Sequence, residues 1–358
     1  MSRVYLDWNA TAPLRPEARD AMIAAMDVVG NPSSVHGEGR KAHILIETAR
    51  EQIAELAGVD RNEVIFTSGA TEGAALATQG RSVACADFEH DAVLAHRNEV
   101  LGARKDGELD FDTLESDVLA LQSSNSETGM LQNNFHWAQR AWKTGAMVLV
   151  DGSQSAGRFG TTVSDLGADF LMLSAHKLGG PKGVGALCLK LGVEVKDVFG
   201  GGGQEQGRRS GTENVIGIVG FGAAAAAAER DRKAGLWDGV YALRNQLEEK
   251  IANVAYDAIF VSKDSPRLPN TSCIAVPGWK GETQVMQMDL AGYAISAGSA
   301  CSSGKVKRSR VLTAMGFDDI TASSAIRVSI GPTTTQNELM GFADAWLAQY
   351  KKFKARAA

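Results

Sequence analysis

Between residues 64 and 190, short apolar segments alternate with segments that carry apolar residues at helical spacing. Each apolar segment is bounded by Gly, Pro or polar residues, which is typical of buried strands. The expected strands are Val64–Phe66, Val83–Ala86, Val118–Leu121, Met147–Val150, Phe170–Leu173 and Val184–Leu189. Strands that alternate with helices predict an α/β fold, in which a mostly parallel sheet is covered by helices on both faces.

Polar residues follow several of these expected strands. They are Thr71, His90, Asn125, Asp151 and Lys177. Because ligands of open α/β sheets bind beyond the carboxyl ends of the strands, these side chains are expected to meet at one site.

The pattern changes after Pro266–Pro269. Before it, helices are expected at 16–28, 38–57 (ending at Gly58), 72–79, from Asp91, at 134–144, 213–230 and 237–254. After it, strands 272–276, 293–296 and 325–330 alternate with helices 282–291, 307–315 and 335–350. A length of 358 residues fits two domains. We expect a large domain at 13–255, and a smaller α+β domain from residues 1–12 and 256–358.

Charge and cysteine usage exclude several classes of protein. The net charge of −5 gives no general attraction to nucleic acid or to an anionic membrane. No apolar run reaches the ~20 residues of a spanning helix, and the chain does not open with a signal peptide. The four cysteines are far apart and form no Cys-x-x-Cys pair, which argues against a disulfide framework and a zinc site. We therefore expect a cytoplasmic protein without a metal centre.

Lys177 lies in a turn rich in Gly and Pro between two expected strands, flanked by Ser174 and His176. A lysine at the mouth of a sheet can form a Schiff base with an aldehyde cofactor. A solvated turn lysine is the more common case for a lysine taken alone. The cofactor hypothesis gains weight because matching residues occur elsewhere in the chain.

These matching residues are those that pyridoxal phosphate requires. Ser68-Gly69-Ala70-Thr71, at the start of an expected helix, can bind the phosphate, although Ser or Thr there is often only an N-cap. Asp151 can keep the pyridinium nitrogen protonated, or simply form a turn. Gln154 can hydrogen-bond the phenolic oxygen of the ring, and Asn125 can reach the same side. His90 can stack on the ring and shuttle protons, or cap the following helix.

Ten short motifs, in order along the chain, resemble the cysteine desulfurases of the NifS/IscS type. They are Tyr5–Thr11, Asn31–Ser34, Thr67–Glu72, Glu89–His90, Asn125–Gly129, Asp151–Gln154, Ser174–Gly180, Arg209–Thr212, Gly298–Cys301 and Ile326–Arg327. The resemblance covers nearly the whole length and implies the fold-type I architecture of pyridoxal-phosphate-dependent transferases, as a homodimer.

The resemblance also implies a role for each site residue. Lys177 would be the Schiff-base lysine, His90 the ring-stacking acid and base, and Asp151 the partner of the pyridine nitrogen. Further cofactor contacts would come from Ala70, Thr71, Asn125, Gln154, Ser174 and His176, with Thr212 supplied by the other subunit. Asn31 and Arg327 would bind the α-carboxylate of L-cysteine, for which a guanidinium is a natural clamp.

Cys301 distinguishes this family from other aminotransferases. It lies in a run of small residues that predicts an exposed loop, whereas Cys85, Cys188 and Cys273 are expected to be buried. The nearby cations Lys305, Lys307, Arg308 and Arg310 would favour the thiolate. The resemblance implies that this thiolate attacks the substrate sulfur, which leaves alanine and a Cys301 persulfide. An acceptor protein of iron–sulfur cluster assembly or tRNA thiolation would receive the sulfur, with Cys301 in transient contact with a cluster.

Three departures from the family pattern are visible. Ser124-Asn125-Ser126-Glu127 stands where Asn-Asn-Glu is usual, Asn133-Asn134 replaces a common proline, and the stretch 107–125 is short. Two other functions stay open: a selenocysteine lyase or other pyridoxal phosphate aminotransferase, and a non-catalytic scaffold that has kept the fold.

Overall fold

The computed structural model describes residues 3–198, 200–298 and 308–357. Its larger sheet has eight strands in the order β2-β9-β8-β7-β6-β3-β4-β5. Their bounds are β2 Val64–Thr67, β3 Val83–Ala86, β4 Glu99–Ala103, β5 Leu109–Asp110, β6 Val118–Gln122, β7 Met147–Asp151, β8 Phe170–Ser174 and β9 Gly185–Leu189. The central strands β8, β7, β6, β3 and β4 are parallel, which confirms the mostly parallel sheet. β9 runs antiparallel to both β2 and β8, and β5 antiparallel to β4.

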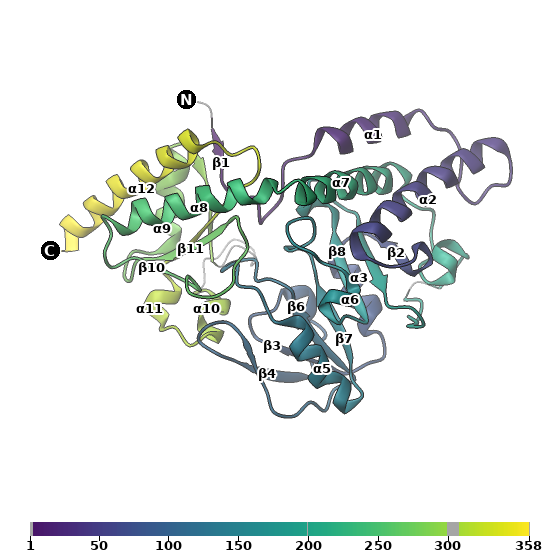
Figure 1. Cartoon of the computed structure of the whole chain (residues 1–358), viewed down its shortest axis with the longest axis horizontal. Coiled ribbons are helices and arrows are strands. Elements are labelled where there is room, and N and C mark those ends of the chain that lie inside the picture. The colour runs from purple at the N-terminus through teal and green to yellow at the C-terminus, as the bar shows by residue number, and fades with distance from the viewer. Residues whose placement is uncertain (1–2, 199, 299–307, 358) are drawn as a thin grey trace.

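Helices cover both faces of this sheet (Figure 1). Their bounds are α1 Pro16–Met26, α2 Gly37–Ala57, α3 Ala70–Thr78, α4 Asp91–Leu94, α5 Asn134–Thr144, α6 Val163–Leu166 and α7 Val215–Lys233. Successive strand residues enter different cores: Leu171 packs with α2, α5 and α7, whereas Phe170 packs with α3. Successive residues of a strand point to opposite faces of the sheet, and here both faces are covered. These strands are therefore apolar at every position.

A second core lies under α8 Leu236–Ala252 and α12 Gln336–Ala357, at the left of Figure 1. Its four-stranded antiparallel sheet has the order β10-β11-β14-β13. The strands are β10 Ile259–Phe260, β11 Thr271–Ala275, β13 Ser296–Ala297 and β14 Ala325–Ser329, with helices α9 Gly281–Leu290, α10 Arg310–Ala314 and α11 Asp319–Ala322. β1 Val4–Tyr5 pairs in parallel with β12 Tyr293–Ala294. The N-terminus therefore packs with the C-terminal elements, and so does α8.

Most expected elements are present, and the differences have local causes. α2 ends at Gly58 as expected, because this glycine has the left-handed φ of 65°. The helix expected from Asp91 is only the single turn α4, and the edge strands β4 and β5 were missed. β4 has the mixed composition EVLGA, with exposed residues in its burial pattern, so it lacks the apolar signal of the inner strands. The expected strand 293–296 is two short strands, β12 and β13.

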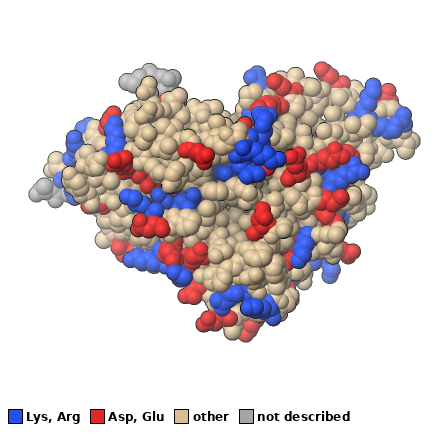
Figure 2. All heavy atoms as spheres, in the orientation of Figure 1, with Lys and Arg blue, Asp and Glu red and all other residues tan. Residues whose placement is uncertain are grey.

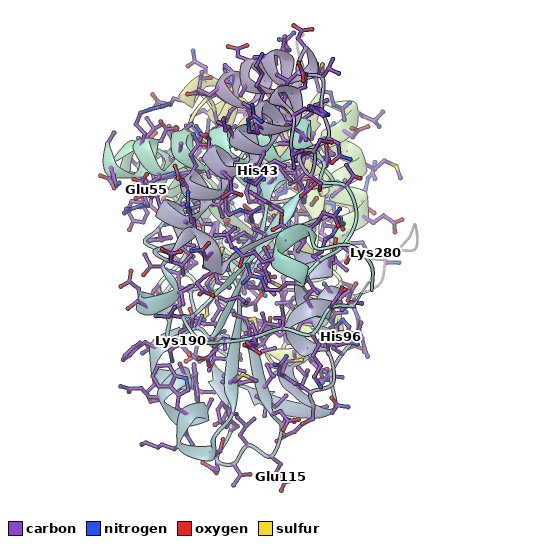
Figure 3. All side chains as sticks on the ribbon, turned by 90° about the vertical axis from the view of Figure 1, so that its right-hand side faces the viewer. His43, Glu55, His96, Glu115, Lys190 and Lys280 are labelled. Atoms are coloured by element: carbon purple, nitrogen blue, oxygen red, sulfur yellow. The ribbon has the colours of Figure 1, made fainter. Side chains whose placement is uncertain are left out.

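The carboxyl ends of β7 and β8 face the N-terminal segment that packs with the smaller core, since Gln154 and Lys177 both bond Asn9. In Figure 3, Glu115, which precedes β6, lies at the foot of the molecule, and His43 on α2 lies in its upper part. β6 therefore runs from the foot of the view toward its upper part. The ends of β6, β7 and β8 carry the residues described next.

Candidate active site

Lys177 lies in a single 3-10 turn at the end of β8. Its Nζ donates hydrogen bonds to the backbone carbonyl oxygens of Asn9, at 2.5 Å, and Ala10, at 3.0 Å. The lysine expected at the mouth of the sheet is thus half-buried under the N-terminal segment, not free in solvent.

Asn9 is the centre of a buried polar network around this lysine. Its carbonyl oxygen also accepts a hydrogen bond from Nε2 of Gln154, at 3.0 Å. Its side-chain Oδ1 accepts one from Arg158 Nη1, at 3.0 Å. Its Nδ2 donates to Ser126 O and Thr271 Oγ1. Asn9 is 1% exposed, so these bonds are shielded from water.

Arg327, on β14, reaches the same network from the smaller core. Its Nη1 donates to Ser126 O at 2.9 Å, the carbonyl that also accepts from Asn9. Its Nη2 forms an ion pair with Asp7 Oδ1 at 2.6 Å. The third nitrogen, Nε, is buried without a hydrogen-bond partner in the described chain. A buried guanidinium edge with an unused donor is suited to a carboxylate ligand.

Asp151 is the last residue of β7 and lies beside a second, fully buried carboxyl. Asp151 Oδ1 accepts a hydrogen bond from Ser153 N at 2.9 Å. Glu89 is 1% exposed, and its Oε1 accepts from Gln122 N, the strand partner of Asp151. Burial raises the pKa of Glu89 well above its usual value, and the negative Asp151 raises it further. Two carboxyl groups thus meet at this strand edge, and burial favours the protonated form of Glu89.

His90 caps α4, as its alternative interpretation expected. Its Nδ1 accepts a hydrogen bond from Ala92 N at 3.1 Å, so a neutral ring carries its proton on Nε2. Arg310, at the start of α10, holds the same turn: it donates to the carbonyls of Asp87 and Glu89 and pairs with Asp91. The turn that carries His90 is thereby tied to the helix that follows residues 299–307.

The amino end of α3 faces open space next to the end of β9. A Cβ built on Gly69, the residue before α3, would meet no atom within 4 Å. A Cβ on Gly185, by contrast, would lie 2.7 Å from Gly69 Cα. Ala70 and Thr71 form the first turn of α3, and Thr71 is exposed. Free N–H groups of a helix start next to open space can bind an anion.

Ser174 and His176 flank the lysine, as the sequence requires. Ser174 is the buried last residue of β8. His176 Nδ1 lies 2.8 Å from Thr11 Oγ1. Burial and the neighbouring charges of Lys177 and Lys182 lower the pKa of His176 to about 4, so its ring is neutral at physiological pH.

The side chain of Asn125 forms hydrogen bonds within its own turn. Its Oδ1 accepts hydrogen bonds from the N–H groups of Glu127 and Thr128, both at 2.9 Å. Its Nδ2 donates weakly to Phe88 O and Gln122 Oε1. Glu127 in this turn is 4% exposed, and its Oε1 has no hydrogen-bond partner among the described residues. A Cβ on Gly298 would clash with this carboxyl, so Gly298 and Glu127 lie in direct contact.

Two described site residues, Asn31 and Thr212, lie in exposed loops and form no hydrogen bond with the Asn9 network. Asn31 is exposed, and its Oδ1 accepts a hydrogen bond from Ser33 N in its own turn. Thr212 is exposed in the loop before α7. Cys301 lies outside the described residues, as do Lys305 and Lys307. Arg308 and Arg310 are described, and each pairs with an aspartate.

The other cysteines are where the sequence placed them. Cys85, Cys188 and Cys273 are buried free thiols. Burial raises the pKa of both Cys85 and Cys188 to about 12, so neither is a thiolate at neutral pH. Within the described ranges, no group of three His, Cys, Asp or Glu residues could hold a metal ion. In the same part of the chain, every helix is too short or too polar to cross a membrane.

Sequence reasoning missed the residues that connect the site. Asn9, Asp7 and Arg158 were given no role, although Asp7 and Asn9 belong to the motif Tyr5–Thr11. The sequence offered one signal for them: Asp7 and Asn9 are polar residues in an N-terminal segment with no expected helix or strand, where a role in binding or positioning is plausible from residue type alone. Their importance depends on contacts with Thr271 and Arg327, which are far away in the sequence.

The family model for class-V aminotransferases matches residues 4–342. A cysteine desulfurase from Cereibacter sphaeroides is 38% identical to this chain over 368 aligned residues, which cover 95% of this chain and 93% of that protein. The cysteine desulfurase IscS of Dictyoglomus turgidum is 35% identical, with 94% of this chain and 91% of that protein covered.

Solved structures agree with these relatives. A NifS-like protein from Rickettsia africae superimposes with a TM-score of 0.89 and 31% identity, covering 98% of this chain and 99% of that one. A match of this quality confirms the expected α/β architecture of the pyridoxal-phosphate-dependent transferases. The chain belongs to the class-V aminotransferase family, and within it to the cysteine desulfurases.

Proposed function

We propose that this chain converts L-cysteine to L-alanine with pyridoxal 5'-phosphate as cofactor, and that it takes the sulfur as a persulfide on Cys301. The observation that carries the proposal is the position of Lys177. Its amine lies at the carboxyl end of β8, held by two carbonyl oxygens, in a network that ends at the unused donor of Arg327.

The residues present fit pyridoxal phosphate. The open space at Gly69 and the amino end of α3 suit its phosphate, with Ala70, Thr71, Ser174 and His176 around it and Thr212 from a partner subunit. The Asp151 carboxyl at the end of β7 suits the pyridine nitrogen. Gln154 and Asn125 would contact the ring, and His90 would lie against it. When bound, the cofactor supplies an electron sink for the substrate α-carbon.

The protein's own groups then carry out three tasks. Arg327, oriented by Asp7, would bind the substrate carboxylate through its free Nε–H, with Asn31 nearby in the assembled enzyme. Lys177 would hold the cofactor and then, displaced by the substrate amine, move the α-proton. The Cys301 thiolate would form a bond to the substrate sulfur as the carbon–sulfur bond breaks. The electron pair of that bond stays with the carbon, which becomes the methyl group of alanine after protonation.

We also propose a homodimer. Large apolar side chains are exposed around the turn between α1 and α2: Ile23 is 52% exposed, Met26 59%, Val29 79% and Val35 88%. A hollow of about 500 Å³ beside this turn is lined by Pro32, Ser33 and the loop that leads to Thr212. Exposed apolar patches of this kind mark protein interfaces. With a partner subunit at this face, Asn31 could contribute to substrate binding, and Thr212 could contact the cofactor in the other subunit.

We also propose domain boundaries, a location in the cell and a class of sulfur acceptor for this enzyme. The large domain would comprise residues 13–255, with its last helix α8 packed against the small domain, and residues 1–12 and 256–358 would form the small domain that carries Cys301. We place the enzyme in the cytoplasm because its described cysteines are free thiols. The sulfur acceptor would be a protein of iron–sulfur cluster assembly or of tRNA thiolation.

The test is incubation of the purified protein with L-cysteine, followed by measurement of alanine and by mass spectrometry of Cys301. Without a reductant we expect alanine and a mass increase of one sulfur on the peptide that contains Cys301, and with an added thiol reductant, which reduces the persulfide, we expect alanine in step with sulfide. Cys301→Ala should abolish both, whereas Cys85→Ala, which changes a buried thiol, should retain both. Alanine release from Cys301→Ala at the wild-type rate would remove this thiol from the mechanism. Turnover of selenocysteine alone would make the enzyme a selenocysteine lyase.

A further inference from the structure

A second cavity, of about 1040 Å³, borders the polar network at Arg158. It is bounded by α8, by the segment 263–269 and by the turn at residues 158–160. Figure 2 shows Lys and Arg side chains gathered near the junction of α7 and α8, on this face of the molecule. A volume of this size is at the upper end of what small-molecule sites have.

Arg158 lines this cavity, and no carboxylate of the described residues pairs with its buried guanidinium. The residue is 5% exposed, and its Nη1 donates to the amide oxygens of Asn9, Gln154 and Asn270, at 3.0, 3.1 and 3.4 Å. Among the described residues its guanidinium forms no ion pair, its hydrogen bonds come from Nη1, and its central carbon lies 5.6 Å from the centre of the Trp237 ring. Burial and the charge of Arg327 lower the pKa of Arg158 to about 9, which still leaves it protonated at pH 7.

Arg244, on α8, is a second such residue in the same cavity. It is 3% exposed, and it donates to Asn245 Oδ1 and Leu268 O, both neutral oxygens. Arg267 nearby differs, because Glu248 neutralises it through two hydrogen bonds of 2.9 and 3.0 Å. Arg158 and Arg244 therefore form no ion pair with a described carboxylate, although the cavity is also lined by acidic residues and the charge of Glu248 opposes the lowering of the Arg244 pKa by burial. A buried unpaired charge is costly, and an anionic ligand would remove that cost.

We propose that this cavity binds a small molecule with an oxyanion group, a carboxylate or a phosphate, that accepts hydrogen bonds from Nε and Nη2 of Arg158. The charge of Arg244 attracts the same group. The site lies outside the desulfurase chemistry and does not depend on it. Arg158 also donates to Gln154, whose amide shares the Asn9 carbonyl with Lys177. A ligand bound in the cavity would therefore affect the position of Lys177 through the side chain of Gln154.

The experiment is isothermal titration of the full-length protein, loaded with pyridoxal phosphate so that the cofactor's own phosphate site is filled. The probes are inorganic phosphate and succinate, each against sodium chloride of equal ionic strength. We expect one equivalent of at least one oxyanion to bind per chain. The two titrations distinguish a phosphate ligand from a carboxylate ligand, and binding by neither at about 10 mM overturns the proposal.

Three variants assign the binding to Arg158. Arg158→Met should weaken binding roughly tenfold or more, the loss expected for charge-assisted hydrogen bonds. Arg230→Met is the matched control, because Arg230 is an exposed α7 arginine that pairs with Glu17 and does not line the cavity. If Arg158→Met does not fold by circular dichroism, Arg158→Lys keeps the charge, loses the Nε donor and should show intermediate weakening. Equal affinity in wild type and in a folded Arg158 variant would contradict the proposal.

Discussion

Lys177 and Gln154 donate hydrogen bonds to the same oxygen, the backbone carbonyl of Asn9, at 2.5 and 3.0 Å. The lysine comes from the turn after β8 and the glutamine from the turn after β7, so a shared acceptor fixes the distance between two strand ends. That acceptor belongs to a segment that packs with the smaller core through Leu6. The position of the proposed catalytic amine thus depends on how the two cores meet.

The side chain of Asn9 is expected to stabilise the protein. Its removal should leave in place the backbone carbonyl that accepts the hydrogen bond of Lys177. Asn9→Ala removes the partners of Arg158, Asn270 and Thr271 but keeps the backbone carbonyl that Lys177 uses. Buried polar groups left without partners should lower the free energy of unfolding by about 2–4 kcal/mol. Chemical denaturation measures this loss. Asn62→Ala, at an exposed site, should change stability little, and an equal loss in both variants would refute the role of the network.

Replacement of Lys177 tests the proposed attachment of the cofactor. Lys177→Ala should yield no pyridoxyl peptide after borohydride reduction, and turnover of cysteine should fall by roughly 10²- to 10⁴-fold, because the group that moves the proton is gone. Lys182→Ala is the control, since Lys182 is an exposed lysine of the same turn. Peptide mapping by mass spectrometry gives the result. A pyridoxyl adduct at Lys182 in wild-type protein would transfer the role to that residue.

Arg327 should determine substrate affinity. Arg327→Lys keeps a positive charge but loses the unpartnered Nε donor and the planar geometry that binds a carboxylate. We expect KM for cysteine to rise by roughly tenfold or more, the value of a charge-assisted hydrogen bond, with a smaller change in kcat. Arg308→Lys, an exposed arginine paired with Asp319, provides the comparison. An unchanged KM in Arg327→Lys would place the substrate carboxylate elsewhere.

The elements that could be predicted from sequence are those whose signals are local. The apolar runs of β6, β7 and β8 and the stop of α2 at Gly58 need only neighbouring residues. The position of Lys177 followed in the same way, from a Gly-rich turn after an apolar run.

The parts that were missed depend on distant partners. Asn9 gains its role from Thr271, 262 positions away, and Arg158 from a cavity formed partly by α8. In the sequence Glu89 looks like an ordinary charged residue before a histidine, yet it is buried, and this burial raises its pKa well above the usual value. Burial of a carboxyl is a property of packing, and no local pattern reports it.

Glu127 should make the protein less stable as pH rises. Burial raises its pKa to about 7 from an ordinary value of 4.5, against the opposing effects of Ser309 and Arg327. Between pH 4.5 and about 7 the folded state therefore keeps a proton that the unfolded state has lost. Over this range the free energy of unfolding falls, by up to about 1.4 kcal/mol per pH unit from this group. Above pH 7 its contribution no longer changes.

Denaturant unfolding at pH 5, 6 and 7 (about two pH units within the window) measures that slope. Glu127→Gln mimics the protonated carboxyl, so the variant should lose this part of the pH dependence and show a flatter profile. Glu108→Gln changes a partly exposed glutamate that bonds the Trp137 ring nitrogen, and should keep the wild-type slope. Identical slopes in wild type and Glu127→Gln would show that Glu127 is ionised throughout.

The buried ion pair between Arg50 and Glu205 anchors the loop before α7 onto α2 and β2. Arg50 donates from Nη1 and Nη2 to the two oxygens of Glu205, at 2.7 and 2.9 Å, and Phe66 N donates to the same carboxylate. Glu205→Gln leaves Arg50 buried without this counter-charge and should cost about 3–5 kcal/mol of unfolding free energy. Glu47→Gln makes the same change on the more exposed Nε side of Arg50 and should cost less than about 1 kcal/mol. Chemical denaturation compares the two variants, and equal losses would mean that burial does not decide the strength of these pairs.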